Sequence, residues 1–488
     1  MTEIGTRATG SPPLPFAFCA PGDRQAILWA AILASSMGFI DSSVTSIAIP
    51  AIREALRASL PEVQWIGAGY LLALSSLVLA GGALGDRFGT ARVFSAGIWL
   101  FVITSLACAA ATTPEQLIAA RTLKGVGAAL MVPGSMALVA RAFPREERGR
   151  ALGLWAAAST ATTAFGPVLG GALITWGGEA GWRAIFALNL PLGLISLWLI
   201  RGRTPGDKGS PGQAVDWVGA VLATAGLTSL AYTLTATAGP VWPYALAAVT
   251  CGAGFVIWEA RAPAPMIRLG LFRNPGFALT TVVTLALYFA LNGVMFYLPM
   301  TAVSVWGVTA VEVTAAFLPI SVLIGVLSAP AGRWADQIGA GPLMAAGSAL
   351  VALAYGGLAL VAARGQFWAE IVPLMALAGT GLGLVVAPLT AAVMAGASEG
   401  EQGAASGINN AVARVAGLLA VALLGKLASL AYGAPGADLP GFGLPGADPA
   451  HLAATSAAFA RVALVGAVMA AVAAALSLSM GRQMTARR

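Results

Sequence analysis

The chain has 488 residues, of which 58% are hydrophobic and only 10% charged, and its mean hydropathy is +0.83. Soluble domains are about one-quarter charged, so this composition excludes a string of soluble domains and indicates a membrane protein. The formal net charge of +7 does not indicate nucleic-acid binding, because the basic residues fall in short loops rather than in stretches interleaved with aromatic residues. The three cysteines and the single histidine, His451, have no metal-ligand spacing.

Fourteen segments are long and apolar enough to cross a bilayer, which requires about 20 residues per helix. They lie at 26–50, 62–82, 92–111, 116–141, 151–175, 183–200, 217–237, 241–259, 277–303, 311–331, 341–362, 367–393, 404–431 and 453–480. No signal peptide is expected, because some 25 mostly polar residues precede the first segment and this segment is too long for the apolar core of a signal peptide. The sequence therefore predicts an all-α polytopic membrane protein.

The basic residues predict the orientation of the chain. With fourteen spans both termini lie on one side, and the loops and tails of that side hold eighteen Arg and Lys residues, against four in the opposite loops. Because cytoplasmic loops are enriched in Arg and Lys, both termini are expected in the cytoplasm of a protein of the inner (plasma) membrane.

Residues that favour helix starts and loops agree with these boundaries. Capping boxes are predicted at 59–62, 113–116 and 309–312, each at the start of a helix on the outer side. Clusters of proline and glycine at 204–212 and 434–446 indicate longer loops.

An internal repeat divides the chain. The sequence Gly-x-x-x-Asp-x-x-Gly follows the second predicted helix, at 82–89, and occurs again after the tenth, at 332–339. One copy is compatible with an ordinary glycine C-cap, but two copies 250 residues apart indicate two six-helix units with two inserted helices between them. Paired halves around one central site are typical of alternating-access carriers.

The expected organisation follows from this repeat. A cytoplasmic tail (1–25) precedes an N-terminal six-helix bundle (26–201), and a linker with two further helices (202–276) leads to a C-terminal six-helix bundle (277–481) and a short tail (482–488).

Several motifs, in the correct order along almost the whole chain, resemble the major facilitator superfamily, and most closely its fourteen-helix drug:proton antiporter branch, which includes multidrug efflux transporters. They are GALGDRFGTAR at 82–92, RTLKGVG at 121–127, GPVLGG at 166–171, Asp41 with Ala-Ile-Pro at 48–50, Gln-Trp at 64–65 with Tyr-Leu-Leu at 70–72, and Asn-Leu-Pro-Leu-Gly at 189–193. The resemblance resumes at 307–319 and 403–417.

The resemblance implies roles for particular residues. Gly82, Asp86, Arg87, Gly89 and Arg92 correspond to a conformational latch between the halves, and Asp336 stands at the same place in the second copy. The residues of the motif associated with exporters are Gly166, Pro167, Gly170 and Gly171.

Two departures from the family pattern affect these expectations. Lys124 stands where members of the family usually have glutamine. The second latch copy has Gln337 where the first has Arg87, so a weaker latch is expected there.

Ionisable residues within membrane helices are costly and are candidates for function. Asp41 is the one acidic residue near the middle of a predicted span, and Arg121 and Lys124 lie on one face of the fourth. If the first and fourth helices are neighbours, as the resemblance implies, Asp41 can pair with one of these cations and act as a proton switch. The alternative is a static buried ion pair that fixes helix packing.

A central cavity is expected to bind the substrate. Its candidate residues are Trp65, Tyr70, Asn189, Asn292, Phe296 and Arg414. Arg414 either binds substrate or extends toward a helix end without a substrate role.

The sequence thus predicts a proton-coupled antiporter that exports drugs or amphipathic small molecules. An exporter of a specific metabolite or lipid precursor on the same fold is the alternative. A monomer is expected, because one chain holds both halves. A membrane enzyme is disfavoured because the sequence has no HExxH or GxSxG motif and no metal-spaced cluster. ATP is not expected as the direct energy source because the sequence has no Walker A motif. No cofactor is expected, and the energy would come from a proton gradient.

Overall fold

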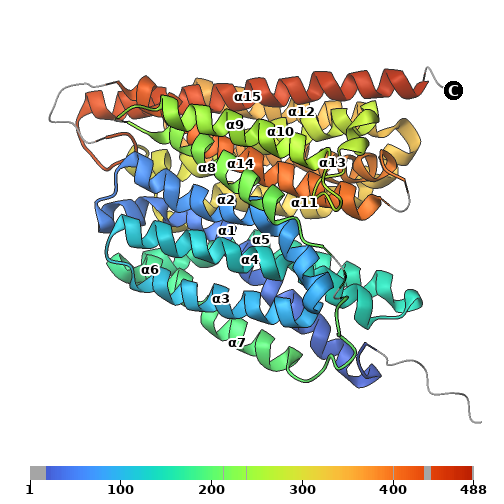
Figure 1. Cartoon of the computed structure of the whole chain (residues 1–488). Helices are drawn as coiled ribbons and strands as arrows, with labels where there is room; N and C mark the ends of the chain where they lie inside the picture. Colours follow the sequence, from blue (N-terminus) through green and yellow to red (C-terminus); the bar gives the residue numbers. More distant parts are fainter. Residues whose placement is uncertain are drawn as a thin grey trace, which may run out of the picture.

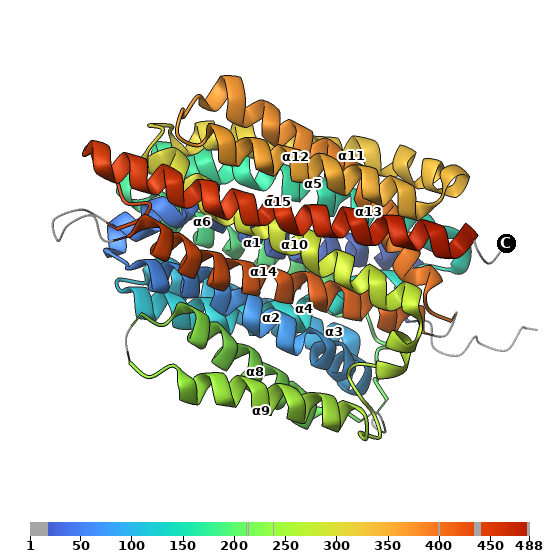
Figure 2. The same ribbon diagram turned by 90° about the horizontal axis from the view of Figure 1, so that it is seen from above.

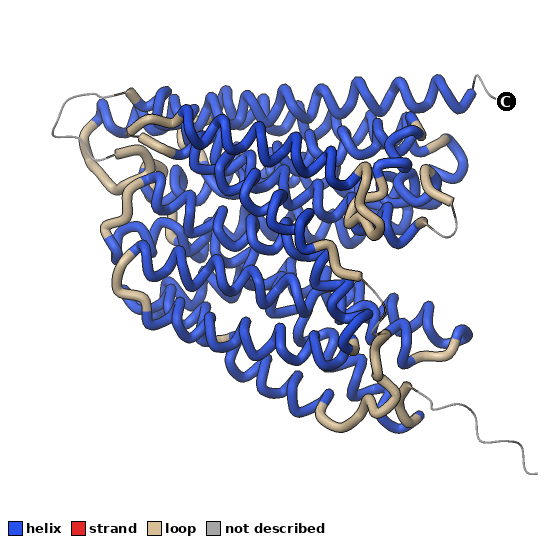
Figure 3. Tube along the Cα trace, in the orientation of Figure 1, coloured by secondary structure: helices blue, strands red, loops and turns tan. Residues whose placement is uncertain are grey.

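A computed structural model describes residues 18–210, 212, 214–237, 239–398, 401–433 and 441–485. These residues form helices joined by short loops and turns, with no strand among them (Figure 3). The all-α fold that the sequence predicts is therefore confirmed.

The helices follow the predicted spans in order. The N-terminal half contains α1 (Arg24–Leu56), α2 (Leu60–Phe88), α3 (Thr90–Ala110), α4 (Pro114–Ala142), α5 (Arg145–Gly177), α6 (Gly181–Ala187) and α7 (Asn189–Ile200). Next come α8 (Trp217–Thr235) and α9 (Trp242–Glu259). The C-terminal half contains α10 (Pro275–Ser304), α11 (Ala310–Ile338), α12 (Ala340–Val361), α13 (Val372–Ala395), α14 (Gln402–Tyr432) and α15 (Pro449–Thr485).

The number of candidate membrane spans among the described residues differs from the fourteen predicted. Within the described residues, twelve segments are long and apolar enough to cross a membrane. The two predicted spans outside this set lie in α5 and α9. In α5 the described apolar part is the short Phe165–Gly177, and α9 carries Trp, Pro and Tyr at its start and Glu259 at its end, which lowers its mean hydropathy.

The sixth predicted span is interrupted. The segment Gly181–Ile200 is formed by α6 and α7, which meet at Leu188. Pro191 explains the break, because it has no N–H to donate to the carbonyl of Ala187 and its ring crowds that carbonyl.

The internal repeat appears as two helices of equal length. Both α2 and α11 have 29 residues, begin with a reciprocal capping box (Ser59 with Glu62, Thr309 with Glu312) and end at a glycine of positive φ. These glycines are Gly89, with φ 101°, and Gly339, with φ 90°. Only glycine adopts this conformation without strain. The predicted box at 113–116 is partial, because Thr113 caps α4 but the side chain of Gln116 accepts from Thr112.

The two halves lie one above the other in Figure 1, with the N-terminal half (blue to cyan) below and the C-terminal half (yellow to red) above. Across the seam α2 packs on α14, α5 on α11 and α1 on α10. Figure 2 shows α8 and α9 as an adjacent pair at the edge of the bundle, where α8 contacts α2 and α14. We call the end of the bundle where α1 begins and α15 ends the proximal end, and the opposite end the distal end.

Hydrogen bonds join the halves at the distal end. The Gln64 side chain donates to the Tyr297 hydroxyl (2.9 Å) and to the Val421 carbonyl (2.8 Å), and Arg53 donates to the carbonyl of Phe442. Gly425 lies against this network: a Cβ there would be 2.3 Å from the Tyr297 hydroxyl and would overlap the Gln64 amide. We call this group of contacts the distal seal.

At the proximal end, Asp86 and Asp336, in the two copies of the repeated turn, are both exposed, as is Arg333. Among the described residues, no hydrogen bond or ion pair joins these turns, so the described conformation is closed distally and separated at the repeated turns.

We expect Gly425→Ala to open the distal seal, because the added methyl displaces the Gln64 amide from Tyr297. The distance between spin labels at Glu54 and Ala447, both exposed at the distal end, should increase. Gly356→Ala is the matched control, since nothing lies within 4 Å of a Cβ at Gly356. An unchanged distance in Gly425→Ala would show that the seal does not hold the halves together.

Candidate functional site

A buried cluster of three charged side chains lies within the N-terminal half. Arg121 Nη1 and Lys124 Nζ, both on α4, each lie 2.5 Å from a different carboxylate oxygen of Asp41 on α1. The residues are only 0–2% exposed. The sequence predicts a pairing with one cation, whereas the structure brings both to the same carboxylate.

Neighbouring groups hold the two cations in place. Arg121 Nε donates to the carbonyl of Ile66 (2.9 Å), and its guanidinium lies 4.8 Å from the ring centre of Tyr70. Lys124 Nζ lies over the rings of Phe101 (4.6 Å) and Phe186 (4.8 Å). Aromatic faces stabilise cations, most strongly where water is excluded. The second positive charge therefore has partial compensation from the ring faces.

The cluster carries an excess charge when all three groups are ionised, because one carboxylate faces two cations. In a medium of low dielectric constant this arrangement strongly favours ionised Asp41. Protonation of Asp41 would leave two buried like charges without a counterion, so proton binding requires one cation to move or to gain another partner.

A cavity of about 290 Å³ lies between the two halves and reaches this cluster. It is lined from the N-terminal half by Phe39, Ser42, Ser43, Thr45, Ser46, Gly67, Tyr70, Leu71, Arg121 and Pro167. From the C-terminal half it is lined by Leu291, Asn292, Met295, Phe296, Phe317, Ile320, Ser321, Ile324 and Val421. Most of this surface is apolar, and Arg121 provides a charged group on its wall.

Three of the predicted cavity residues, Tyr70, Asn292 and Phe296, line this space. Trp65 instead donates its indole N–H to Thr235 of α8 (3.0 Å), and Asn189 is buried at the start of α7, where it donates to the carbonyl of Phe186 (3.3 Å). Both are therefore placed away from the described cavity. The sequence analysis missed the serine and threonine side chains of α1, which the spacing 42, 43, 45, 46 places on the face beside Asp41.

Arg414 lies on α14 next to the cavity. Gly417, one turn along, packs against Asn292, and Val421, two turns along, lines the cavity. The hydroxyl groups of Tyr70 and Tyr288 lie close enough to interact with the charge of Arg414. Its Nε atom is buried and has no hydrogen-bond partner among the described residues.

The glycines of the motif at 166–171 lie where α5 meets other helices. A Cβ at Gly170 would be 2.2 Å from Val44 of α1, and one at Gly171 would be 2.6 Å from Thr314 of α11. Pro167 lines the cavity. The motif therefore brings α5 against both its own half and the opposite half.

The predicted latch residues do not meet across the halves in this conformation. Arg87 stacks its guanidinium on Phe88 (5.2 Å), and the carbonyl of Asp86 accepts from Ser210 (2.8 Å). Asp336 is exposed on the opposite half. Gly82 lies near Pro133, and Arg92 is exposed at the start of α3.

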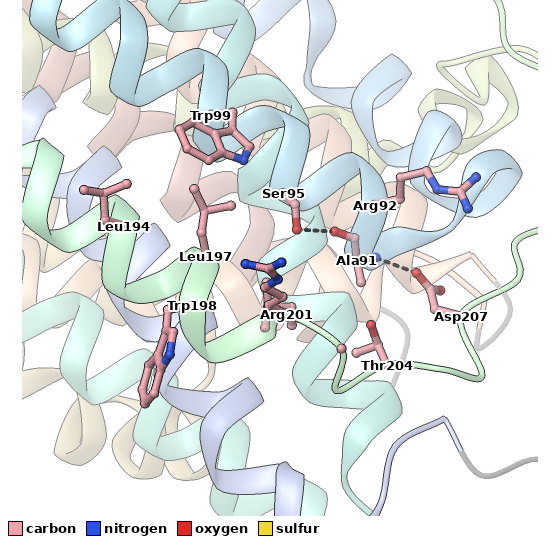
Figure 4. Close-up of a pocket in the computed structure, with 12 residues that line it drawn as sticks. Ala91, Arg92, Ser95, Trp99, Leu194, Leu197, Trp198, Arg201, Thr204 and Asp207 are labelled. Atoms are coloured by element: carbon pink, nitrogen blue, oxygen red, sulfur yellow. Dashed lines mark hydrogen bonds between the residues drawn. The ribbon is translucent and has the colours of Figure 1, made fainter.

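Asp207, which the sequence analysis did not single out, holds the first turn of α3. Its carboxylate accepts from the amide of Ala91 (2.6 Å) and from Arg141 (2.8 Å). Figure 4 shows Asp207 at one end of a second cavity of about 630 Å³ between α3 and α7, which also includes Trp99, Leu194 and Trp198. This cavity lies on the outside of one half, away from the seam.

Comparison with known proteins agrees with this architecture. Residues 31–421 match the family model of the Major Facilitator Superfamily. The chain is 32% identical to the methylenomycin A resistance protein of Bacillus subtilis, over 81% of this chain and 85% of that protein. It is 31% identical to the tetracenomycin C resistance and export protein of Streptomyces glaucescens, over 82% of this chain and 76% of the relative.

A solved structure has the same fold. The bacterial homologue of the human lysosomal transporter Spinster, in an inward-facing and unoccupied conformation, superposes with a TM-score of 0.69 at 16% identity, over 96% of this chain and 99% of that one. The family model matches most of the chain, and these relatives are named for drug resistance and export. The chain therefore belongs to the major facilitator superfamily and is a membrane transporter, not an enzyme.

Proposed function

We propose that the chain is a proton-coupled antiporter that exports drugs or other amphipathic small molecules by alternating access. The observation that carries this proposal is the buried Asp41, held by Arg121 and Lys124 beside the cavity between the halves. The relatives named for antibiotic resistance and multidrug resistance support the substrate class.

The cluster suggests how proton and substrate compete. Arg121 contacts both Asp41 and the cavity. While Asp41 is ionised, it holds Arg121 at the wall of the cavity and leaves the cavity free for substrate. A proton on Asp41 removes the counterion of Arg121, which then turns into the cavity and displaces the substrate; loss of the proton restores the ion pair and the binding site. Because only the cation next to the cavity has to move, substrate and proton need not share one site.

We further propose that α5 and α9 also cross the membrane, which gives the fourteen crossings of the drug:proton antiporter branch. The distribution of basic residues supports cytoplasmic termini in the plasma membrane.

The inserted helices are hydrogen-bonded to both halves. Trp65 of the N-terminal half donates to Thr235, and Lys426 of the C-terminal half donates to the carbonyl of Ala236 (3.2 Å). One chain holds both halves, so we propose a monomer as the working unit.

The charges around the cavity favour neutral, zwitterionic or anionic substrates over divalent cations. Arg121 is on its wall, Arg414 lies beside it, and Asp41 is already held by two cations. A dication would meet like charges in a site of low dielectric constant, which is costly. Tight, Asp41-dependent transport of a dication would contradict this proposal.

Asp41→Asn should abolish gradient-driven accumulation of substrate, because asparagine does not exchange a proton. The measurement is uptake of a panel of lipophilic compounds into proteoliposomes with an imposed pH gradient. Glu54→Gln, which removes an exposed carboxyl group of the same helix, is the matched control and should accumulate substrate as the wild type does. A folded Asp41→Asn variant that is still gradient-driven would place the proton-coupling site elsewhere.

Lys124→Gln should rescue the stability of Asp41→Asn. Removing the carboxylate alone leaves two buried cations unpaired, which costs about 3–5 kcal/mol, and removing one of them relieves that repulsion. We expect a double-mutant cycle of unfolding free energies in detergent to give a coupling of roughly 0.5–3 kcal/mol.

The control for this cycle is Lys426→Gln, a cation on α14 that bonds to Ala236 and not to the cluster. Its effect should add to that of Asp41→Asn without coupling. Additive effects for Lys124→Gln would show that Asp41 and Lys124 do not stabilise each other.

Arg414→Gln should weaken transport of a carboxylate more than that of its neutral amide. We expect a loss of about tenfold for naphthaleneacetic acid relative to naphthaleneacetamide, equivalent to about 1.4 kcal/mol of charge-assisted binding. Initial rates over a range of concentrations measure the difference. Equal losses for both compounds would assign Arg414 to helix packing.

A further inference from the structure

Two carboxyl groups meet at the proximal end of the α8–α9 pair, far along the chain from Asp41. Asp216 immediately precedes α8 and Glu259 ends α9, so the antiparallel helices bring them together at one end of the pair. Both are buried, with exposed fractions of 9% and 3%. Figure 2 shows the pair of helices at the edge of the bundle.

One oxygen of each carboxyl group already has partners. Asp216 Oδ1 accepts from the amide of Gly219 (2.8 Å) and from the indole N–H of Trp258 (2.7 Å). Glu259 Oε2 accepts from the amide of Ile267 (2.8 Å). These bonds fix the start of α8, the last turn of α9 and the segment that follows it.

The second oxygen of each group points to the same place. Asp216 Oδ2 and Glu259 Oε1 lie 2.6 and 2.7 Å from the position that a Cβ on Gly219 would take. Both are buried and have no donor among the described residues. Because an ionised carboxylate only accepts hydrogen bonds, one of these groups can donate to the other only when it carries a proton.

Among the ion pairs of the described residues, none joins a basic side chain to Asp216 or Glu259. In the segment after α9, Arg261 and Arg268 are exposed, and Arg268 faces Glu401 (3.8 Å). The helices α2 and α14 pack against α8, and each of their charged side chains is exposed or has another partner. On α2, Glu62 accepts from Ser59, Asp86 is exposed and Arg87 lies on the ring of Phe88. On α14, Arg414 lies near the hydroxyls of Tyr70 and Tyr288, and Lys426 donates to the carbonyl of Ala236. Two ionised carboxylates would therefore repel each other with no nearby cation.

We propose that Asp216 and Glu259 share one proton and so form a proton-binding site, separate from the Asp41 cluster, that fastens residues 260–268 to the α8–α9 pair. Glu259 donates its proton to Asp216 Oδ2 while its other oxygen accepts from Ile267. Loss of the proton leaves two carboxylates in contact, and their repulsion separates Glu259 from Asp216 and releases the Ile267 amide. This segment leads into α10, so the site controls how firmly the inserted helices are joined to the C-terminal half.

The test is hydrogen–deuterium exchange of the full-length protein in nanodiscs, followed in the peptide that covers 260–268 at acidic and alkaline pH. After correction for intrinsic exchange, the wild type should lose protection at alkaline pH by about tenfold, the effect of one pKa unit of differential proton binding. Glu259→Gln should stay protected at both pH values, because its amide donates to Asp216 as the protonated acid does.

Asp216→Asn is the second mimic of the protonated pair and should also be insensitive to pH. It keeps the test decisive if Glu259→Gln does not fold. Glu54→Gln, at an exposed carboxyl group of the distal end, should keep the wild-type pH response. Wild-type protection that does not change with pH, or equal pH responses in the wild type and both mimics, would overturn the proposal. Because exchange is measured without substrate or a proton gradient, the result does not depend on antiport through Asp41.

Discussion

The N-terminal half depends on one carboxylate that compensates two cations where water is scarce. Without Asp41, Arg121 and Lys124 would face each other across a single turn of α4 with only carbonyl and aromatic partners. Uncompensated buried charge is among the costliest features that a fold can contain. Pairing Asp41 with both cations requires α1 to pack against α4. The same pairing places Arg121 at the wall of the cavity.

The halves contribute differently to the cavity. The N-terminal half supplies the charged cluster and the hydroxyl groups of α1, while the C-terminal half supplies mainly apolar side chains with Asn292 among them. Ionisable chemistry is thus concentrated in one half, and a surface that fits varied apolar shapes in the other. Such a division suits a carrier whose substrates share amphipathic character more than a particular functional group.

The sequence predicted the helical fold well, because apolar length is a local signal, and the repeated turn ends two helices of equal length. The neighbourhood of Asp41 followed from the family resemblance, but the simultaneous contact with two cations did not, since it depends on the rotation of α4. Trp65 and Asn189 were wrongly assigned to the cavity, because knowing the helix of a residue does not reveal which neighbouring helix its side chain faces. Asp216 and Glu259 were separated by 43 positions, and only the antiparallel pairing of α8 and α9 brings them together. The span count differed at α5, where the described apolar part is only Phe165–Gly177, and at α9, which begins with Trp, Pro and Tyr and ends with Glu259.

The small side chains of the distal seal have a consequence for energetics. At Gly425 and Gly171 the halves approach without interlocking side chains, and three hydrogen bonds from Gln64 and Arg53 supply the polar contacts. At a net 0.5–1.5 kcal/mol each, these bonds contribute about 1.5–4.5 kcal/mol to closure, and the apolar side chains buried in one core across both halves add to it. A ligand shifts the populations of two conformers only by as much as it prefers one of them. A bound molecule of modest preference can therefore offset the polar part of the distal seal, whereas the apolar part is shared with the core.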